Sequence, residues 1–120
     1  AKSWRAMPAK GSDLDGWTFS NLVARFGDIM WRLSDNHGEM LSLRTYSKYI
    51  STLEGLTDDS PLAIYDAEFG CDDHTRCLLE EYDVPKCFSR DLFELSKGPS
   101  RPPYRWILIG PERSGTGLHI

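Results

Sequence analysis

The segment Tyr104–Ile109 carries the strongest structural signal in this 120-residue chain, because aromatic and β-branched residues dominate it. Such residues favour extended backbone, where their side chains pack well on a pleated surface. Residues 110–115 predict a turn, and residues 116–120 open a second strand at which the sequence stops. An apolar strand without a closing turn leaves an unpaired edge, which folded domains avoid. We therefore expect the chain to be the front part of a longer polypeptide.

The stretch before this β-rich end shows helical as well as strand periodicity. Apolar residues recur three and four positions apart over Phe19–Phe26, which predicts an amphipathic helix. Thr18 is its expected cap, and Gly27 is expected to end it in a left-handed turn. Ile29–Leu33 alternates as a half-buried strand does, and Met40–Arg44 is its expected hairpin partner.

A second helix is expected from Tyr46 to Leu53, with Thr45 as its cap and Gly55 as its stop. One strand and two short helices are expected in the chain that follows: Leu62–Tyr65, Leu78–Tyr82 and Ser89–Leu95. The fold class predicted is thus α+β, in at most one domain. It has three parts: an irregular leading segment at 1–16, a helical and mixed part at 17–103, and the first strands of a β-rich core at 104–120.

The charge balance excludes some classes of partner. Fourteen Lys and Arg against 18 Asp and Glu give a net charge of −4. Direct nucleic-acid binding is disfavoured, because it relies on a basic surface. No apolar run approaches the roughly 20 residues of a membrane-spanning helix, so no membrane partner is expected. The three cysteines cannot all pair within the chain, which favours a reducing intracellular compartment.

Cys71, His74 and Cys77 form a C-x2-H-x2-C pattern, with Cys87 as a further thiol. Zinc binds such side chains in closely spaced pairs. This spacing, however, matches no common zinc finger, and all the candidate ligands lie in one acidic region. We interpret the group as a solvated histidine beside partly buried thiols.

Two polar clusters are further candidates. Asp72-Asp73 with Glu80-Glu81 has the carboxylates needed for acid–base chemistry or a hard cation, but such a run is more commonly a solvated face. Glu112–Ser114 lies in a glycine-bounded turn that suggests phosphate binding, yet it lacks the lysine and the following helix of phosphate loops. Neither cluster is the favoured site.

His119 is the favoured candidate. On an extended strand Gly117 and His119 share one face, and a residue at position 121 would share it too. A carboxylate there would aim an H-x-D or H-x-E pair at one metal ion, which iron oxygenases combine with a third, distant ligand. The spacing therefore predicts a metal ligand at His119, with a core histidine as the alternative.

Two longer blocks, Arg101–Trp106 and Gly110–Ile120, resemble the approach to the iron site of Jumonji-C oxygenases. The branch they resemble most is that of the bifunctional arginine demethylase and lysyl hydroxylase. The similarity runs back through 82–86 and 58–62 to Trp17. It thus covers nearly the whole chain.

This resemblance implies a double-stranded β-helix, a jelly roll of the cupin kind, behind a helical and mixed portion. It implies Fe(II), 2-oxoglutarate as cosubstrate, and hydroxylation or demethylation of arginine or lysine side chains in proteins, with histone tails as one candidate. By motif match His119 is the first iron ligand and a catalytic residue, Thr116 contacts the 2-oxoglutarate carboxylate, and Trp106 is a packing residue. The family also implies a nuclear location, whereas nothing indicates an oligomeric state.

Two positions depart from the family pattern. Ala63 stands where a tyrosine near 2-oxoglutarate is expected, although Tyr65 faces the same side two residues later. Ideal alternation puts Thr116 on the opposite face from His119, unless a bulge at a neighbouring glycine re-aims it.

The remaining iron ligands and the cosubstrate lysine of the family would lie beyond residue 120, so we expect the segment to be inactive alone. Two alternatives stay open. The Ala63 departure is compatible with a non-catalytic Jumonji-C-like binding scaffold. An unrelated α+β interaction module would use Trp106 and His119 as core residues.

Overall fold

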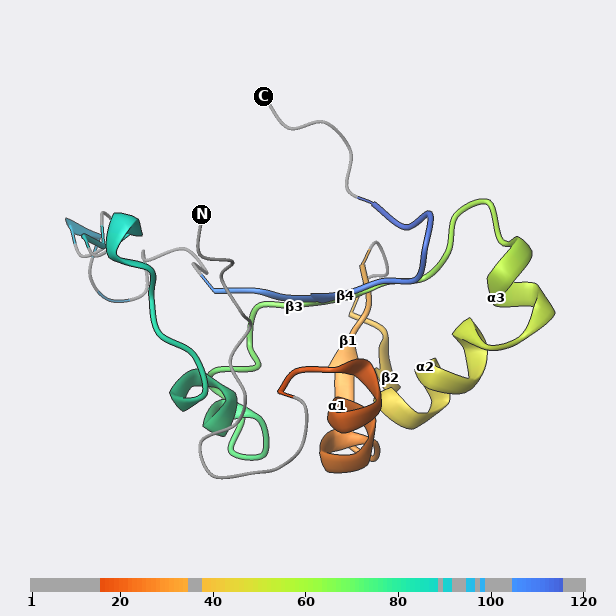
Figure 1. Cartoon of the computed structure of the whole chain (residues 1–120), viewed down its shortest axis with the longest axis horizontal. Coiled ribbons are helices and arrows are strands. Elements are labelled where there is room, and N and C mark those ends of the chain that lie inside the picture. Colours follow the sequence, from red (N-terminus) through yellow and green to blue (C-terminus); the bar gives the residue numbers. More distant parts are fainter. Residues whose placement is uncertain are drawn as a thin grey trace.

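The computed structural model of the chain describes residues 16–34, 38–88, 90–91, 95–96, 98 and 105–115. Its elements follow in this order: α1 Phe19–Phe26, β1 Met30–Arg32, β2 Met40–Ser42, α2 Leu43–Ile50, α3 Leu53–Thr57, β3 Ile64–Asp66, the 3₁₀ helices η1 Arg76–Glu80 and η2 Lys86–Phe88, and β4 Ile107–Ile109 (Figure 1). The described strands form two small antiparallel sheets. The predicted α+β class is therefore confirmed.

Helix α1 forms where its apolar stripe predicts. Thr18 caps it as expected, because its hydroxyl oxygen accepts a hydrogen bond from the Asn21 backbone N–H at 3.3 Å. The prediction of a left-handed turn at Gly27 is wrong, since this residue has φ −56° and ψ −33°. Glycine serves close packing here instead: a Cβ would lie 2.5 Å from the Val23 carbonyl oxygen.

Strands β1 and β2 form the predicted antiparallel hairpin, with Trp31 opposite Leu41. Strand β2 ends at Ser42, two residues earlier than expected, because the next two residues already belong to α2. Ser42 rather than Thr45 caps that helix, since its hydroxyl accepts from the Thr45 N–H at 3.2 Å. A cap must precede the first helical turn, whose N–H groups lack partners within the helix.

The single helix predicted over Tyr46–Leu53 is broken in the structure. Helix α2 ends at Ile50, and Thr52 caps α3 by accepting from the Gly55 N–H at 3.3 Å. Gly55 therefore lies inside α3 instead of ending a helix. A threonine that binds nearby backbone groups competes with continuation of the preceding helix.

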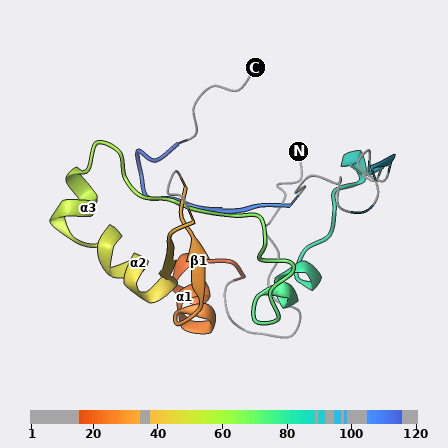
Figure 2. The ribbon, with the colours of Figure 1, turned by 180° about the vertical axis from the view of Figure 1, so that it is seen from behind.

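Strands β3 and β4 pair antiparallel, with Tyr65 opposite Leu108. We call this pair the ribbon. It lies across one end of the β1–β2 hairpin in both views (Figure 1 and Figure 2). An antiparallel bridge between Leu33 and Ile64 connects the hairpin to the ribbon. The two sheets are thus joined by backbone pairing.

The hydrophobic core lies between α1, the hairpin, α2 and the inner face of the ribbon. Its buried members come from every one of these elements and from the loop and 3₁₀ helix after β3: Leu22, Phe26, Trp31, Leu43, Tyr46, Ile64, Phe69, Leu78 and Ile107. Phe26 and Trp31 meet edge to face with ring centroids 6.4 Å apart, a favoured aromatic geometry. Among the described helices there is none with the length and apolar character that crossing a membrane requires.

Several predicted elements are shorter than expected or lie elsewhere. In place of the helix expected at Leu78–Tyr82, the structure has the five-residue 3₁₀ helix η1 at Arg76–Glu80, two residues earlier in the chain. Helices of this type occur in short pieces. Strand β4 occupies only the second half of the strand predicted at Tyr104–Ile109. Three predicted segments lie wholly or largely outside the described residues: 1–15, Ser89–Leu95 and 116–120.

Candidate functional site

The outer face of the ribbon presents aromatic and aliphatic side chains to solvent. Tyr65 and Leu108 pair across the ribbon, and Trp106 precedes Leu108 by two residues, so alternation places all three on one face. Leu108 is 54% exposed and Trp106 is 42% exposed. The Tyr65 and Trp106 ring centroids lie 4.5 Å apart. We call Tyr65, Trp106 and Leu108 the open face.

Ala63 lies at the start of this face. Its carbonyl oxygen accepts a hydrogen bond from the Ser34 N–H at 2.8 Å, which ties the residue to the hairpin through backbone alone. Alternation puts Ala63 on the same side as Tyr65. An alanine methyl offers no hydrogen bond to a ligand, so the Tyr65 hydroxyl is the polar group that this end of the open face can supply.

The two predicted ligand residues, Thr116 and His119, lie outside the described residues. The described chain runs from β4 through the turn at 110–115 and reaches Gly115, the residue before Thr116. Within the described ranges, no three His, Cys, Asp or Glu side chains gather closely enough to hold a metal ion. An iron site in this protein would therefore need side chains from outside these ranges.

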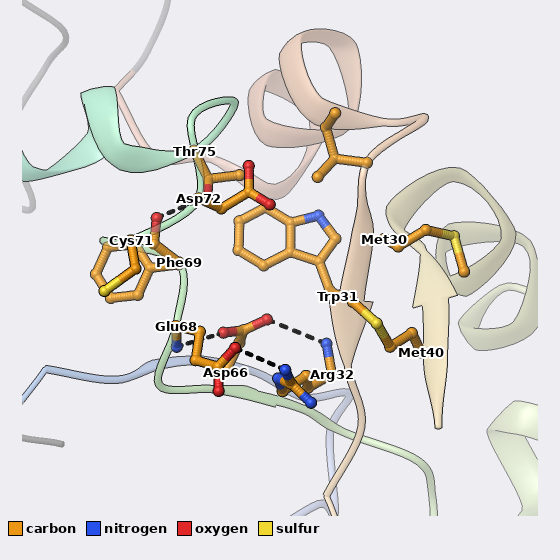
Figure 3. Close-up of a pocket in the computed structure, with 11 residues that line it drawn as sticks. Met30, Trp31, Arg32, Met40, Asp66, Glu68, Phe69, Cys71, Asp72 and Thr75 are labelled. Carbon is orange, nitrogen blue, oxygen red and sulfur yellow. Dashed lines mark hydrogen bonds and ion pairs between the residues drawn. The ribbon is translucent and has the colours of Figure 1, made fainter. Parts of the chain in front are cut away.

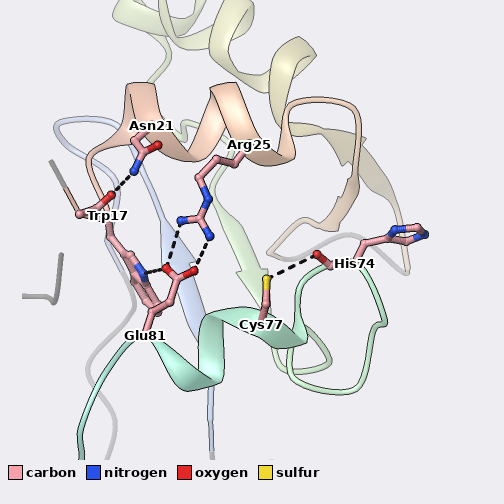
Figure 4. Close-up of polar contacts among 7 residues, drawn as sticks. Trp17, Asn21, Arg25, His74, Cys77 and Glu81 are labelled. Carbon is pink, nitrogen blue, oxygen red and sulfur yellow. Dashed lines mark hydrogen bonds and ion pairs between the residues drawn. The ribbon is translucent and has the colours of Figure 1, made fainter. Parts of the chain in front are cut away.

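The C-x2-H-x2-C group is spread over the surface. Cys71, Cys77 and Cys87 are exposed free thiols, so the expectation of partly buried thiols is wrong. The Cys77 Sγ lies 3.9 Å from the backbone carbonyl oxygen of His74, whereas the imidazole points away from that thiol (Figure 4). The thiols and the ring do not converge on a common ligand position.

The acidic stretch divides into a solvated part and a structural part. Asp72-Asp73 and Glu80 are exposed, as predicted, but Glu81 is not. Its carboxylate accepts hydrogen bonds from Trp17 Nε1 at 2.9 Å and from Arg25 Nη1 at 3.0 Å (Figure 4). The Arg25 hydrogen bond is the largest influence on the pKa of Glu81 and holds it below its usual value. Glu81 therefore fastens the end of η1 to α1.

A cavity of about 300 Å³ lies between the hairpin and the loop after β3 (Figure 3). Its lining combines sulfur-containing, aromatic and acidic side chains, among them Met30, Trp31, Met40, Asp66, Glu68 and Phe69. The buried Asp66 carboxylate accepts from the backbone N–H groups of Arg32 at 3.2 Å and Glu68 at 2.7 Å. The Glu68 carboxylate pairs with the Arg32 guanidinium at 2.6 Å. These acids hold the loop to the hairpin, so we assign them a structural role.

The glycine-bounded turn at 110–115 uses its polar groups within the protein. The Ser114 N–H donates to the Pro111 carbonyl oxygen at 3.1 Å. The Arg113 guanidinium donates to the Asp58 carbonyl oxygen and lies 3.6 Å from the Asp59 carboxylate. A phosphate site would need these donors free, and the structure therefore does not favour one here.

The amino-acid sequence was compared with those of known proteins. No family model matches the chain. The lysine-specific demethylase JMJ21 of Arabidopsis thaliana is 36% identical over 120 residues, which is all of this chain and 12% of that protein. The bifunctional arginine demethylase and lysyl-hydroxylase psr-1 of Caenorhabditis briggsae is 40% identical over 106 residues, 87% of this chain and 26% of that protein. The arginine-specific demethylase JMJ22 of Arabidopsis thaliana is 33% identical over 107 residues, 89% of this chain and 20% of that protein.

The chain is thus homologous to demethylases and hydroxylases of the Jumonji-C type, and the resemblance predicted from the sequence motifs is confirmed. The psr-1 branch named by those motifs is among the matches, and psr-1 of Caenorhabditis elegans is also 37% identical over 109 residues. The chain spans between 12% and 26% of the length of these relatives.

Sequence reasoning missed the polar side chains that hold the site region together. Tyr46 is fully buried, yet its hydroxyl shares its one proton between the carbonyl oxygens of Leu62 at 2.9 Å and Ile109 at 3.1 Å. Burial raises the pKa of Tyr46 to about 12. The sequence did contain a signal for this contact, because Tyr46 lies on the apolar face of a predicted helix. A buried tyrosine hydroxyl needs a hydrogen-bond partner.

Proposed function

We propose that this chain is part of the catalytic domain of an Fe(II)- and 2-oxoglutarate-dependent Jumonji-C oxygenase. Its substrates would be arginine or lysine side chains of proteins, hydroxylated or demethylated, with histone tails as one candidate in a nuclear setting. The observation that carries the proposal is homology along the whole chain to lysine- and arginine-specific demethylases and a lysyl hydroxylase. The acidic balance of −4 suits basic protein tails.

The ribbon supports this proposal through the difference between its two faces. We assign β3 and β4 to the first strands of a double-stranded β-helix, the open face being the side that looks toward cosubstrate and substrate. Ile64 and Ile107 bury the opposite face in the core, which gives the open face a rigid support. Sites built on strands hold their side chains more accurately than sites on loops.

Each residue of the proposed site has a separate role. Iron, when bound, would supply oxygen activation and orient the cosubstrate. His119 would hold the metal through an imidazole nitrogen, and Thr116 would donate its hydroxyl to the 2-oxoglutarate carboxylate. The apolar surface of Trp106 and Leu108 would exclude water from the site, while Tyr65 would supply the polar contact that Ala63 lacks.

A non-catalytic binding scaffold of the same family is the second candidate. Ala63, at the start of the open face, favours it, because that methyl group removes a polar contact expected near the cosubstrate. The two candidates differ in one measurable property, since a scaffold would bind a protein partner without consuming 2-oxoglutarate.

The test is iron-dependent release of succinate from 2-oxoglutarate by the full-length protein. We expect His119→Ala to abolish turnover while leaving the melting temperature unchanged. His74→Ala is the matched control, because His74 is an exposed histidine on the loop before η1, and it should retain turnover. The isolated 120-residue chain should show none. Turnover by the His119→Ala protein would remove His119 from the site, and an inactive wild-type protein would favour the scaffold.

A further inference from the structure

The turn at 110–115 contains an unusual backbone position. Arg113 has φ +75°, a left-handed conformation that residues with a Cβ rarely adopt. Such a conformation persists only where the surrounding contacts enforce it. Contacts with other parts of the protein must therefore hold Arg113, which lies three residues before Thr116, in this conformation.

The guanidinium of Arg113 supplies the first anchor. It donates a hydrogen bond to the backbone carbonyl oxygen of Asp58 and lies 3.6 Å from the Asp59 carboxylate. Asp59 is fully exposed, and an exposed ion pair contributes little by itself. The hydrogen bond to the Asp58 backbone, which is also exposed, is the second contact between this guanidinium and the Asp58–Asp59 loop.

The acceptor side of this contact is itself held in place. The Asp58 carboxylate accepts from the Tyr49 hydroxyl at 2.8 Å and from the Ser60 N–H at 2.9 Å. The Tyr49 hydroxyl in turn accepts from the Leu62 N–H at 3.1 Å. Arg113 thus reaches from the turn to a loop that is fastened to helix α2.

A second anchor holds the other end of the turn. The Tyr46 hydroxyl, also on α2, donates to the carbonyl oxygen of Ile109, the last residue of β4. Inside the turn, the Ser114 hydroxyl donates to the Pro111 carbonyl oxygen at 2.8 Å. The turn is therefore tied to the α2 region both at Ile109 and at Arg113, and Ser114 closes it internally onto Pro111.

We propose that Arg113 is a positioning residue, which clamps the 110–115 turn to the Asp58–Asp59 loop and so fixes the point from which the chain continues to Thr116 and His119. This inference rests on the proposed function of those two residues. Arg113 itself would touch neither cosubstrate nor metal. Small displacements of groups that hold a substrate weaken its productive binding, so loss of the clamp should affect cosubstrate use, and above all the KM for 2-oxoglutarate, more than stability.

The experiment compares Arg113→Gly and Arg113→Lys with the wild type in the full-length protein. Glycine removes the guanidinium but adopts positive φ without strain, so it separates positioning from folding. Two measurements apply: amide hydrogen exchange of residues 110–115, which needs no activity, and the KM for 2-oxoglutarate together with kcat from succinate release. Arg76→Ala is the matched control, since it removes an exposed guanidinium that pairs with Asp73 at 3.0 Å on the surface.

We expect Arg113→Gly to keep the wild-type melting temperature, to exchange the turn amides about tenfold faster, and to raise the KM for 2-oxoglutarate about tenfold with a smaller change in kcat. Arg113→Lys should restore part of both effects, because it keeps a donor, and Arg76→Ala should show neither. Wild-type exchange and wild-type KM in Arg113→Gly would overturn the proposal.

A wild-type protein without 2-oxoglutarate turnover would overturn the proposed function, and the catalytic consequence of the clamp with it. The exchange rates would then still decide whether Arg113 holds the turn. Failure of the clamp and failure of the proposed function are therefore distinguishable.

Discussion

The helix–hairpin layer, residues 19–50, and the β3–β4 ribbon bury their side chains in different ways. In the layer, the large side chains Trp31, Leu43 and Tyr46 are at most 1% exposed. In the ribbon, Ile64 is fully buried on one face, whereas Leu108 on the other is 54% exposed. The layer buries its large side chains against the inner face of the ribbon and the residues that follow β3. The ribbon uses only one of its faces for stability and leaves the other exposed.

Polar contacts to backbone groups connect the layer to the ribbon, and we call these contacts the joint. The Ser34 N–H donates to the Ala63 carbonyl oxygen at 2.8 Å, and Tyr46 reaches across to Ile109. Buried backbone groups need partners, and each of these contacts supplies a donor to a carbonyl oxygen of the ribbon region. The layer therefore positions the ribbon through specific hydrogen bonds as well as through apolar packing.

The largest effect should come from the core of the layer. Leu43→Ala removes a fully buried side chain and should lower the free energy of unfolding by about 2–5 kcal/mol, through lost burial and the cavity left behind. Leu108→Ala, the same substitution on the open face, should cost less than about 0.5 kcal/mol. Urea denaturation of both proteins measures the difference. Equal losses would contradict the contrast between the two regions.

An intermediate effect is expected at the contact between Glu81 and helix α1. Glu81→Gln weakens hydrogen bonds to Arg25 and Trp17 and should cost about 1–3 kcal/mol near neutral pH. Because the pKa of Glu81 is lowered in the folded protein from a usual value of 4.5, its contribution is present above about pH 4.5 and is lost as the pH falls below that value.

Denaturation curves at a series of pH values check this prediction. The wild-type protein should lose stability in acid more steeply than Glu81→Gln does. The matched control is Glu80→Gln, which changes the neighbouring, exposed carboxylate and should follow the wild-type curve. Identical acid profiles for wild type and Glu81→Gln would show that Glu81 stabilises nothing through its charge.

The smallest of these effects should come from the joint. Tyr46→Phe leaves the Leu62 and Ile109 carbonyl oxygens without their donor and should cost about 1 kcal/mol. Tyr65→Phe, on the open face, should leave stability unchanged. Burial raises the pKa of Tyr46 from 10.0 to about 12, so its contribution is complete below pH 10 and is lost as the pH rises toward 12. A Tyr65→Phe loss as large as that of Tyr46→Phe in urea denaturation would contradict this assignment.

Local elements were predictable from the sequence to the extent that their causes are local. Thr18 and its helix, and the hairpin formed by the two strands around Trp31 and Leu41, depend on residues close together in the chain. The errors were also local: Ser42 and Thr52 turned out to be caps, because two good cap residues lay near each predicted boundary. Which residue caps a helix depends on where the preceding strand or helix ends. The helix propensities of the residues alone do not determine that position.

For the candidate site, too, the sequence predicted some features and not others. The motif around His119 predicted the family, and the comparisons confirmed that resemblance. The roles of His119 and Thr116 stay predictions. Alternation also predicted that Tyr65 and Ala63 share one face, but the pairing of Tyr65 with Leu108 and the choice of buried face depended on packing against the layer.

By itself the sequence determined helix α1, the β1–β2 hairpin and the family resemblance, because these follow from periodicity and from residues in one continuous block. Only the tertiary structure decided which polar groups meet. Trp17 and Glu81 are 64 positions apart, Tyr46 and Ile109 are 63 apart, and Arg113 and Asp58 are 55 apart. No pattern of spacing encodes such pairs, since their members come within hydrogen-bonding distance only after the chain has packed.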